Sequence, residues 1–97
     1  MVANATFNPR FSLGRVIITP GAGALLASQS INSMSFLSRH ICGDWGDLDA
    51  DDAAMNEAAI SSKDRILSAY RTSTGEKLWI ITDAGHEVTT LLLPEEY

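Results

Sequence analysis

The residues best suited to chemistry lie in an acidic stretch near the middle of the chain. Three acids have the one-three-five spacing of an EF-hand calcium loop: Asp47, Asp49 and Asp51. Such a loop also needs Gly at its sixth position and a bidentate Glu at its twelfth. Those positions hold Asp52 and Ala58, and Glu57 comes one residue early. The stretch therefore predicts the start of a helix, with Asp49 as N-cap and Asp52 in a carboxylate form of the capping box.

The same acids could form a surface that binds a partner. No basic residue interrupts residues 44–57, so their carboxylates could attract a basic protein or imitate a phosphate backbone. Runs of charge are more often simply solvated helix faces, and a solvated face would also explain these acids. Trp45 lies between Gly43 and Gly46, and two roles are open for it: a lid over the core, or a partly exposed anchor for a partner. The candidate partner-binding residues are Asp44, Trp45, Asp47, Asp51, Asp52 and Glu57.

A second candidate site, for a small enzyme or a ligand-binding protein, consists of His40, Asp44 and His86. A metal site on His40 and Cys42 would need further nitrogen or sulfur ligands, and His86 is the remaining one. Cys42 and His40 are two residues apart at a helix end, so their side chains point in different directions. The sequence has no P-loop, nucleophile elbow or dinucleotide fingerprint. We therefore expect no catalytic residue, no metal and no cofactor.

Composition narrows the class of protein further. The chain has 97 residues, 45% of them hydrophobic, which is enough for one packed core. Its net charge of −5 argues against direct binding to nucleic acid or to an anionic membrane. A single cysteine excludes an internal disulfide, and residues 1–15 lack the long apolar core of a signal peptide or membrane anchor. These features favour a cytoplasmic protein.

Apolar periodicity and turn residues divide the chain into seven elements. Arg15–Thr19 is a β-branched run that predicts a strand, and Thr19 caps a short helix that begins at Pro20 and ends at Ser28. A second helix is expected from Ser30 to about His40, and a third from Asp49 to the Ser61–Asp64 stretch. Three further strands are predicted, joined by hairpins that contain Gly75 and Gly85: Arg65–Arg71, Lys77–Thr82 and Glu87–Leu93.

This order of elements predicts a single α+β domain over residues 1–97, with residues 1–9 flexible. An N-terminal strand and three short helices precede a three-stranded antiparallel meander. Helices are expected to cover one face of the antiparallel sheet. Trp79 is expected in the core beside Tyr70 of the neighbouring strand.

Six segments of the chain resemble a widespread family of small bacterial proteins, usually described as plasmid-related or hypothetical and sometimes given a type I restriction-subunit label. The segments are Phe11–Val16, Thr19–Ala22, Arg39–His40 with Gly43–Leu48, Arg65–Tyr70, Trp79–Thr82 and Leu92–Tyr97. The resemblance covers nearly the whole chain in order. It departs at Asp83–His86, where relatives tend to have an acidic-Ala-Asp-Arg turn, so no role of that turn's charges carries over.

The resemblance implies carriage on plasmids, integrated elements or phages, and it supplies no catalytic residue. We expect a non-enzymatic protein-interaction module of a mobile element. Its partner would be a host or element-encoded protein, for example a nucleic-acid-binding one. Inhibition of a host defence system, restriction or CRISPR, is one role that such a module could have. The alternatives are the small enzyme or ligand-binding protein described above, and a homo-oligomer that uses its exposed sheet face.

Overall fold

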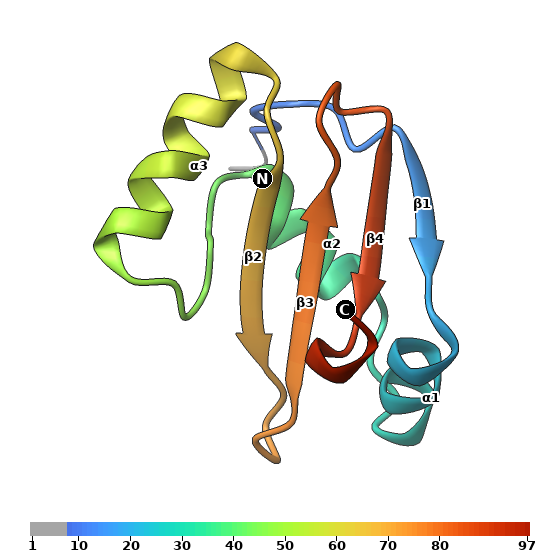
Figure 1. Cartoon of the computed structure of the whole chain (residues 1–97). Helices are drawn as coiled ribbons and strands as arrows, with labels where there is room; N and C mark the ends of the chain where they lie inside the picture. The colour runs from blue at the N-terminus through green and yellow to red at the C-terminus, as the bar shows by residue number, and fades with distance from the viewer. Residues whose placement is uncertain (1–7) are drawn as a thin grey trace, which may run out of the picture.

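The computed structural model describes residues 8–97, and most of the expectation for residues 1–9 therefore lies outside it. Its elements follow the predicted order of one strand, three helices and three strands, with a short 3-10 helix added at the C-terminus (Figure 1). Their bounds are β1 Arg15–Ile18, α1 Pro20–Ser28, α2 Met34–Ile41, α3 Ala50–Ser62, β2 Ile66–Arg71, β3 Lys77–Thr82, β4 Val88–Leu92 and η1 Pro94–Glu96. The chain is α+β, as predicted.

The four strands form one mixed sheet with the order β1-β4-β3-β2. The last three strands are antiparallel neighbours, because two short hairpins connect them. β1 instead runs parallel to β4, with Arg15 beside Val88 and Ile18 beside Leu91. The expectation of a purely antiparallel sheet was therefore wrong. A parallel neighbour needs a long crossover, and the three helices and two strands between β1 and β4 provide it.

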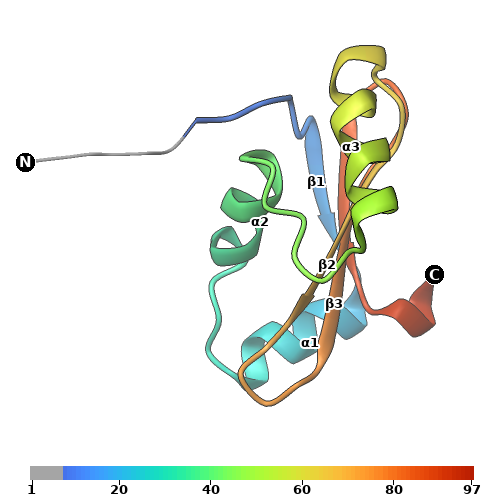
Figure 2. The ribbon, with the colours of Figure 1, turned by 90° about the vertical axis from the view of Figure 1, so that its left-hand side faces the viewer.

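The helices surround the sheet unequally. In the edge-on view α2 lies against one face, and α3 runs beside the sheet at the β2 edge (Figure 2). Of the residues that the structure describes, η1 and the C-terminus lie on the opposite face (Figure 2). Side chains of α1 and α2 pack on alternate residues of the central strands and form the main core of Ala22, Leu26, Phe36, Leu37, Tyr70, Leu78, Ile80 and Leu91. The prediction that helices cover one face of the sheet is thus correct for α2. α3 instead lies beside the β2 edge.

Two of the three helices begin where the sequence predicts. Thr19 accepts a hydrogen bond from the Ala22 amide at the start of α1, and Asp49 accepts one from the Asp52 amide at the start of α3. The expected start of the second helix at Ser30 was wrong, because Ser30 has a φ of +54° and lies in a turn. α2 begins at Met34, whose amide donates to the Asn32 side chain.

The placement of Trp79 also differs from the expectation. Tyr70 faces the α2 side of the sheet and is 2% exposed. Trp79 pairs across the sheet with Ala69 and Leu92 and faces the other side, where its ring meets Tyr97 edge to face at 5.8 Å. Neighbouring residues of a strand point to opposite faces, and Tyr70 pairs with Leu78, not with Trp79.

A buried amide holds α3 against the β2 edge. Asn56 is 4% exposed, and its side chain donates to the Leu67 carbonyl at 2.7 Å and accepts from the Leu67 amide at 3.2 Å. The Asn56 side chain thus hydrogen-bonds the outward N–H and C=O groups of Leu67, as a neighbouring strand would do. This contact sets the position of α3 and of its acidic first turn.

Candidate functional site

The loop between α2 and α3 covers the β2 edge. Gly46 forms a parallel bridge with Ala69: the Ala69 amide donates to the Trp45 carbonyl at 3.1 Å, and the Asp47 amide donates to the Ala69 carbonyl at 2.7 Å. Gly46 has a φ of +74°, and a Cβ at this position would lie 2.0 Å from the Ala69 carbonyl oxygen. Only glycine fits this approach of two backbones. The acidic stretch is therefore fixed to the sheet at its beginning.

Trp45 is 7% exposed and belongs to a second core cluster with Ala59 and Ile66. Its ring stacks on Phe11 at 6.2 Å, and its indole nitrogen donates to the Glu57 carboxylate at 3.1 Å. The lid role is the one that this geometry supports. An exposed anchor would need a free indole face, which Trp45 does not have.

Three arginines meet the predicted acids. Asp44 binds Arg39 at 2.7 Å, Asp47 binds Arg71 at 3.2 Å, and Glu57 holds Arg10 through two hydrogen bonds, the shorter of 2.6 Å. The hydrogen bond from Arg39 lowers the pKa of Asp44, and the hydrogen bonds from Arg10 lower that of Glu57. Three of the six candidate binding residues are therefore neutralised acids.

These ion pairs were hard to predict from the sequence. Arg10 and Arg71 lie far from residues 44–57 along the chain, and only the fold brings them there. Arg39 sits in the last turn of α2, where its charge also complements the helix dipole. Its spacing of five residues from Asp44, across a helix end, is the one signal that could have suggested a local ion pair.

Asp51 and Asp52 remain as exposed acids in the first turn of α3, with no ion pair among residues 8–97. Met55, one turn further on, is 70% exposed. A groove of about 650 Å³ runs between this turn and the start of β2. Its apolar part comes from Leu48, Met55, Leu67 and Ala84, and its polar part from Asp52, Asn56, Asp64 and Arg65.

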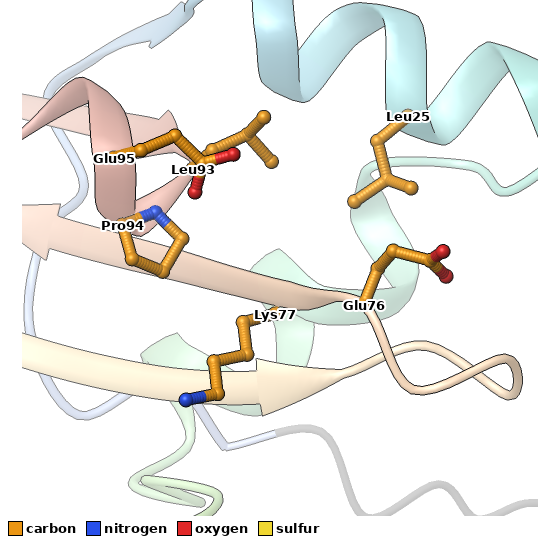
Figure 3. Close-up of a pocket in the computed structure, with 6 residues that line it drawn as sticks. All are labelled: Leu25, Glu76, Lys77, Leu93, Pro94 and Glu95. Carbon is orange, nitrogen blue, oxygen red and sulfur yellow. The ribbon is translucent and has the colours of Figure 1, made fainter.

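A second hollow lies between α1, the start of β3 and η1 (Figure 3). It measures about 550 Å³ and is lined by Leu25, Glu76, Lys77, Leu93, Pro94 and Glu95. The Lys77 ammonium and the Glu76 carboxylate point away from each other, so the hollow does not gather charges of one sign (Figure 3). Its residues match none of the predicted sites.

The three residues of the alternative site do not line one cavity. His40 is fully buried, and His86 is 5% exposed with its Nε2 atom 2.8 Å from the Asp64 carbonyl oxygen. The Phe11 ring lies against both imidazoles, at 5.2 Å from His40 and 5.5 Å from His86. Asp44 faces solvent beside Arg39. Within residues 8–97, no group of three or more His, Cys, Asp and Glu side chains is arranged to hold a metal ion.

His40 instead belongs to a chain of buried hydrogen bonds. Its Nδ1 lies 2.5 Å from the Ser68 hydroxyl, its Nε2 lies 2.9 Å from the Thr82 hydroxyl, and Thr82 lies 2.8 Å from the Thr89 hydroxyl. Thr89 donates to the Leu13 carbonyl, so it must accept from Thr82. Thr82 then accepts from Nε2–H, and Nδ1 accepts from Ser68. The network satisfies a neutral imidazole, and burial, followed by the charge of His86, lowers the pKa of His40 to about 3.

Comparisons of this chain with protein-family models, with curated proteins and with solved structures give no match. Among the described residues no helix combines the length and the apolar character that a membrane crossing requires.

Substitution of Gly46 by Ala should destabilise the protein more than a positive φ alone explains. The left-handed backbone costs Ala about 1 kcal/mol, and the contact with the Ala69 carbonyl should raise the total loss to about 3 kcal/mol in the free energy of unfolding. Gly85→Ala is the matched control, because Gly85 has a φ of +90° and open space around it. Urea unfolding of both variants measures the difference; equal losses would contradict the close approach.

Stability should fall in mild acid because of His40. The unfolded imidazole has a pKa near 6.5, and the folded one about 3, so only the unfolded chain takes up this proton as the pH falls through that window. The free energy of unfolding should drop by up to about 1.4 kcal/mol per pH unit below pH 6.5 and level off near pH 3.

His40→Gln should remove this part of the slope between pH 6.5 and 5, whereas His86→Gln should keep most of it, because burial is the larger cause of the lowered pKa of His40. Urea unfolding at several pH values provides the measurement. A wild-type slope that survives in His40→Gln would show that another group causes it.

Proposed function

We propose that this protein is a non-enzymatic interaction module that binds a basic, partly apolar segment of another protein at the first turn of α3. The observation that carries the proposal is the pair Asp51 and Asp52, which no arginine neutralises in the described part of the chain, beside the groove that Leu48 and Met55 help to line. Unpaired carboxylates attract cations, and a neighbouring apolar groove accepts an aliphatic side chain.

The recognition surface is narrower than the six residues expected from the sequence. Asp44, Asp47 and Glu57 hold arginines of the chain itself, and Trp45 is buried. These four residues support the surface by fixing the loop and α3. Asp51 and Asp52 would make the contact, together with Met55, which is 70% exposed.

The resemblance to plasmid-related proteins supports the proposal that this module is encoded on a mobile element and acts on a host protein. On a mobile element, a small acidic protein would encounter host proteins that carry basic surfaces for nucleic acid. A restriction enzyme or a CRISPR complex of the host cytoplasm is such a partner, and occupation of its basic surface would inhibit it. The enzyme or ligand-binding alternative gains less support, because His40 faces the core and its hydrogen bonds are already made.

An affinity pull-down from a bacterial host lysate tests the proposal with the double variant Asp51→Asn, Asp52→Asn. The N-cap should survive, because Asp49 receives its hydrogen bond from the backbone amide of residue 52. Loss of two rim charges should weaken capture of the partner by about tenfold, which corresponds to about 1.4 kcal/mol, and added salt should weaken wild-type capture in the same way.

The control variant, Glu87→Gln with Glu95→Gln, removes the same charge from two exposed positions outside the groove. It should capture the partner as the wild type does. Equal capture by both double variants, or no captured protein at all, would contradict the proposal.

A further inference from the structure

The two edges of the sheet differ in whether their outward backbone groups have hydrogen-bond partners. At β2, residues 45–47 and the Asn56 side chain form hydrogen bonds with backbone groups on the outer side of the strand. At β1, no other strand of residues 8–97 pairs on the outer side. α1 lies below the carboxyl end of β1 and not beside it (Figure 1). Within residues 8–97, backbone groups of β1 are therefore open to a further strand.

Two residues of β1 present these open groups. The Arg15 amide donates to the Glu87 carbonyl and the Thr19 amide donates to the Leu91 carbonyl, so the odd-numbered residues face β4. By the alternation of a strand, Val16 and Ile18 point their N–H and C=O groups outward. The side chains along this edge are β-branched and exposed: Val16 to 38%, Ile17 to 40% and Ile18 to 42%.

We propose that β1 pairs antiparallel with β1 of a second copy, with Ile17 on the twofold axis. In this register Val16 lies opposite Ile18 of the second copy, and Ile18 lies opposite its Val16. Both residues of each pair point their backbone groups at the partner, so the two pairs form four hydrogen bonds. Ile17 meets Ile17 of the second copy as a closely spaced apolar pair.

Charge complementarity supports the same register. Arg15 makes no ion pair among residues 8–97 and lies on the η1 side of the sheet, with Ile17 and Thr19. In the dimer it lies opposite Thr19 of the second copy. The Thr19 hydroxyl donates to the Glu96 carboxylate at 2.5 Å, so a negative charge lies next to Thr19. Each Arg15 would thus face the Glu96 carboxylate of the other copy, and the dimer would contain two such pairs.

The covered β2 edge limits the assembly to two copies. A pairing through β1 uses the open edge of each chain, and the resulting sheet ends in β2 on both sides. Closure by a twofold axis gives a dimer and not a fibre. The two α3 helices lie at the far ends of this sheet, so the dimer would present two acidic first turns to a partner.

Sedimentation equilibrium of the full chain, from about 5 to 500 µM, tests the proposal. An edge of four residues buries little surface, so we expect weak association with a dissociation constant on the order of 100 µM. The average mass should rise with concentration from the 10.5 kDa of one chain toward twice that value and no further. A mass that stays at one chain throughout, or rises beyond two, would overturn the proposal.

Two variants locate the interface. Ile17→Lys places two ammonium groups on the axis, and Val16→Pro removes an outward amide that donates to no group of β4. Both should remain monomeric at 500 µM while circular dichroism shows folded protein. Met34→Lys, a control at an exposed residue of α2, should associate as the wild type does. Wild-type association by folded Ile17→Lys would overturn the proposal even if Val16→Pro fails to fold.

Discussion

The approach of Gly46 to Ala69 is the constraint on which most of this structure depends. Two backbone hydrogen bonds at this point turn the loop after α2 into a cover for the β2 edge. The same loop places Trp45 over Phe11 and sets Asp47 beside Arg71. It also delivers the chain to Asp49, where α3 begins with its acids facing solvent. One edge of the sheet is consequently closed, and both proposed contacts lie elsewhere, at the first turn of α3 and along β1.

Local signals were strong enough to predict most elements of the fold. Thr19 before Pro20, and Asp49 before Asp52, are capping patterns whose hydrogen bonds form within three residues. Gly75 and Gly85 mark the two hairpins through positive φ. The parallel position of β1 could not be predicted this way, because it depends on pairing with a strand more than seventy residues away. The predicted helix start at Ser30 was wrong for another reason. A residue type that often caps helices does not show that a helix follows it.

The candidate site was harder to predict than the fold, because long-range ion pairs decide its charge. Read along the chain, residues 44–57 contain only acids among their charged residues. In the structure, Arg10, Arg39 and Arg71 pair with half of those six acids. The burial of Trp45 and His40 likewise follows from packing against Phe11 and the sheet. Residue type suggested chemistry at His40, and its saturated hydrogen bonds point to a structural role.

Hydrogen exchange at individual amides, in protein dilute enough to be monomeric, tests the contrast between the two edges most directly. The Asp47 and Ala69 amides donate to carbonyls across the loop–β2 contact, so they should exchange slowly, close to the rate set by global unfolding. The outward amides of Val16 and Ile18 should exchange orders of magnitude faster, although they lie in the same sheet. Fast exchange at Asp47 and Ala69, or protection at Val16 and Ile18 in the monomer, would contradict a sheet with one closed and one open edge.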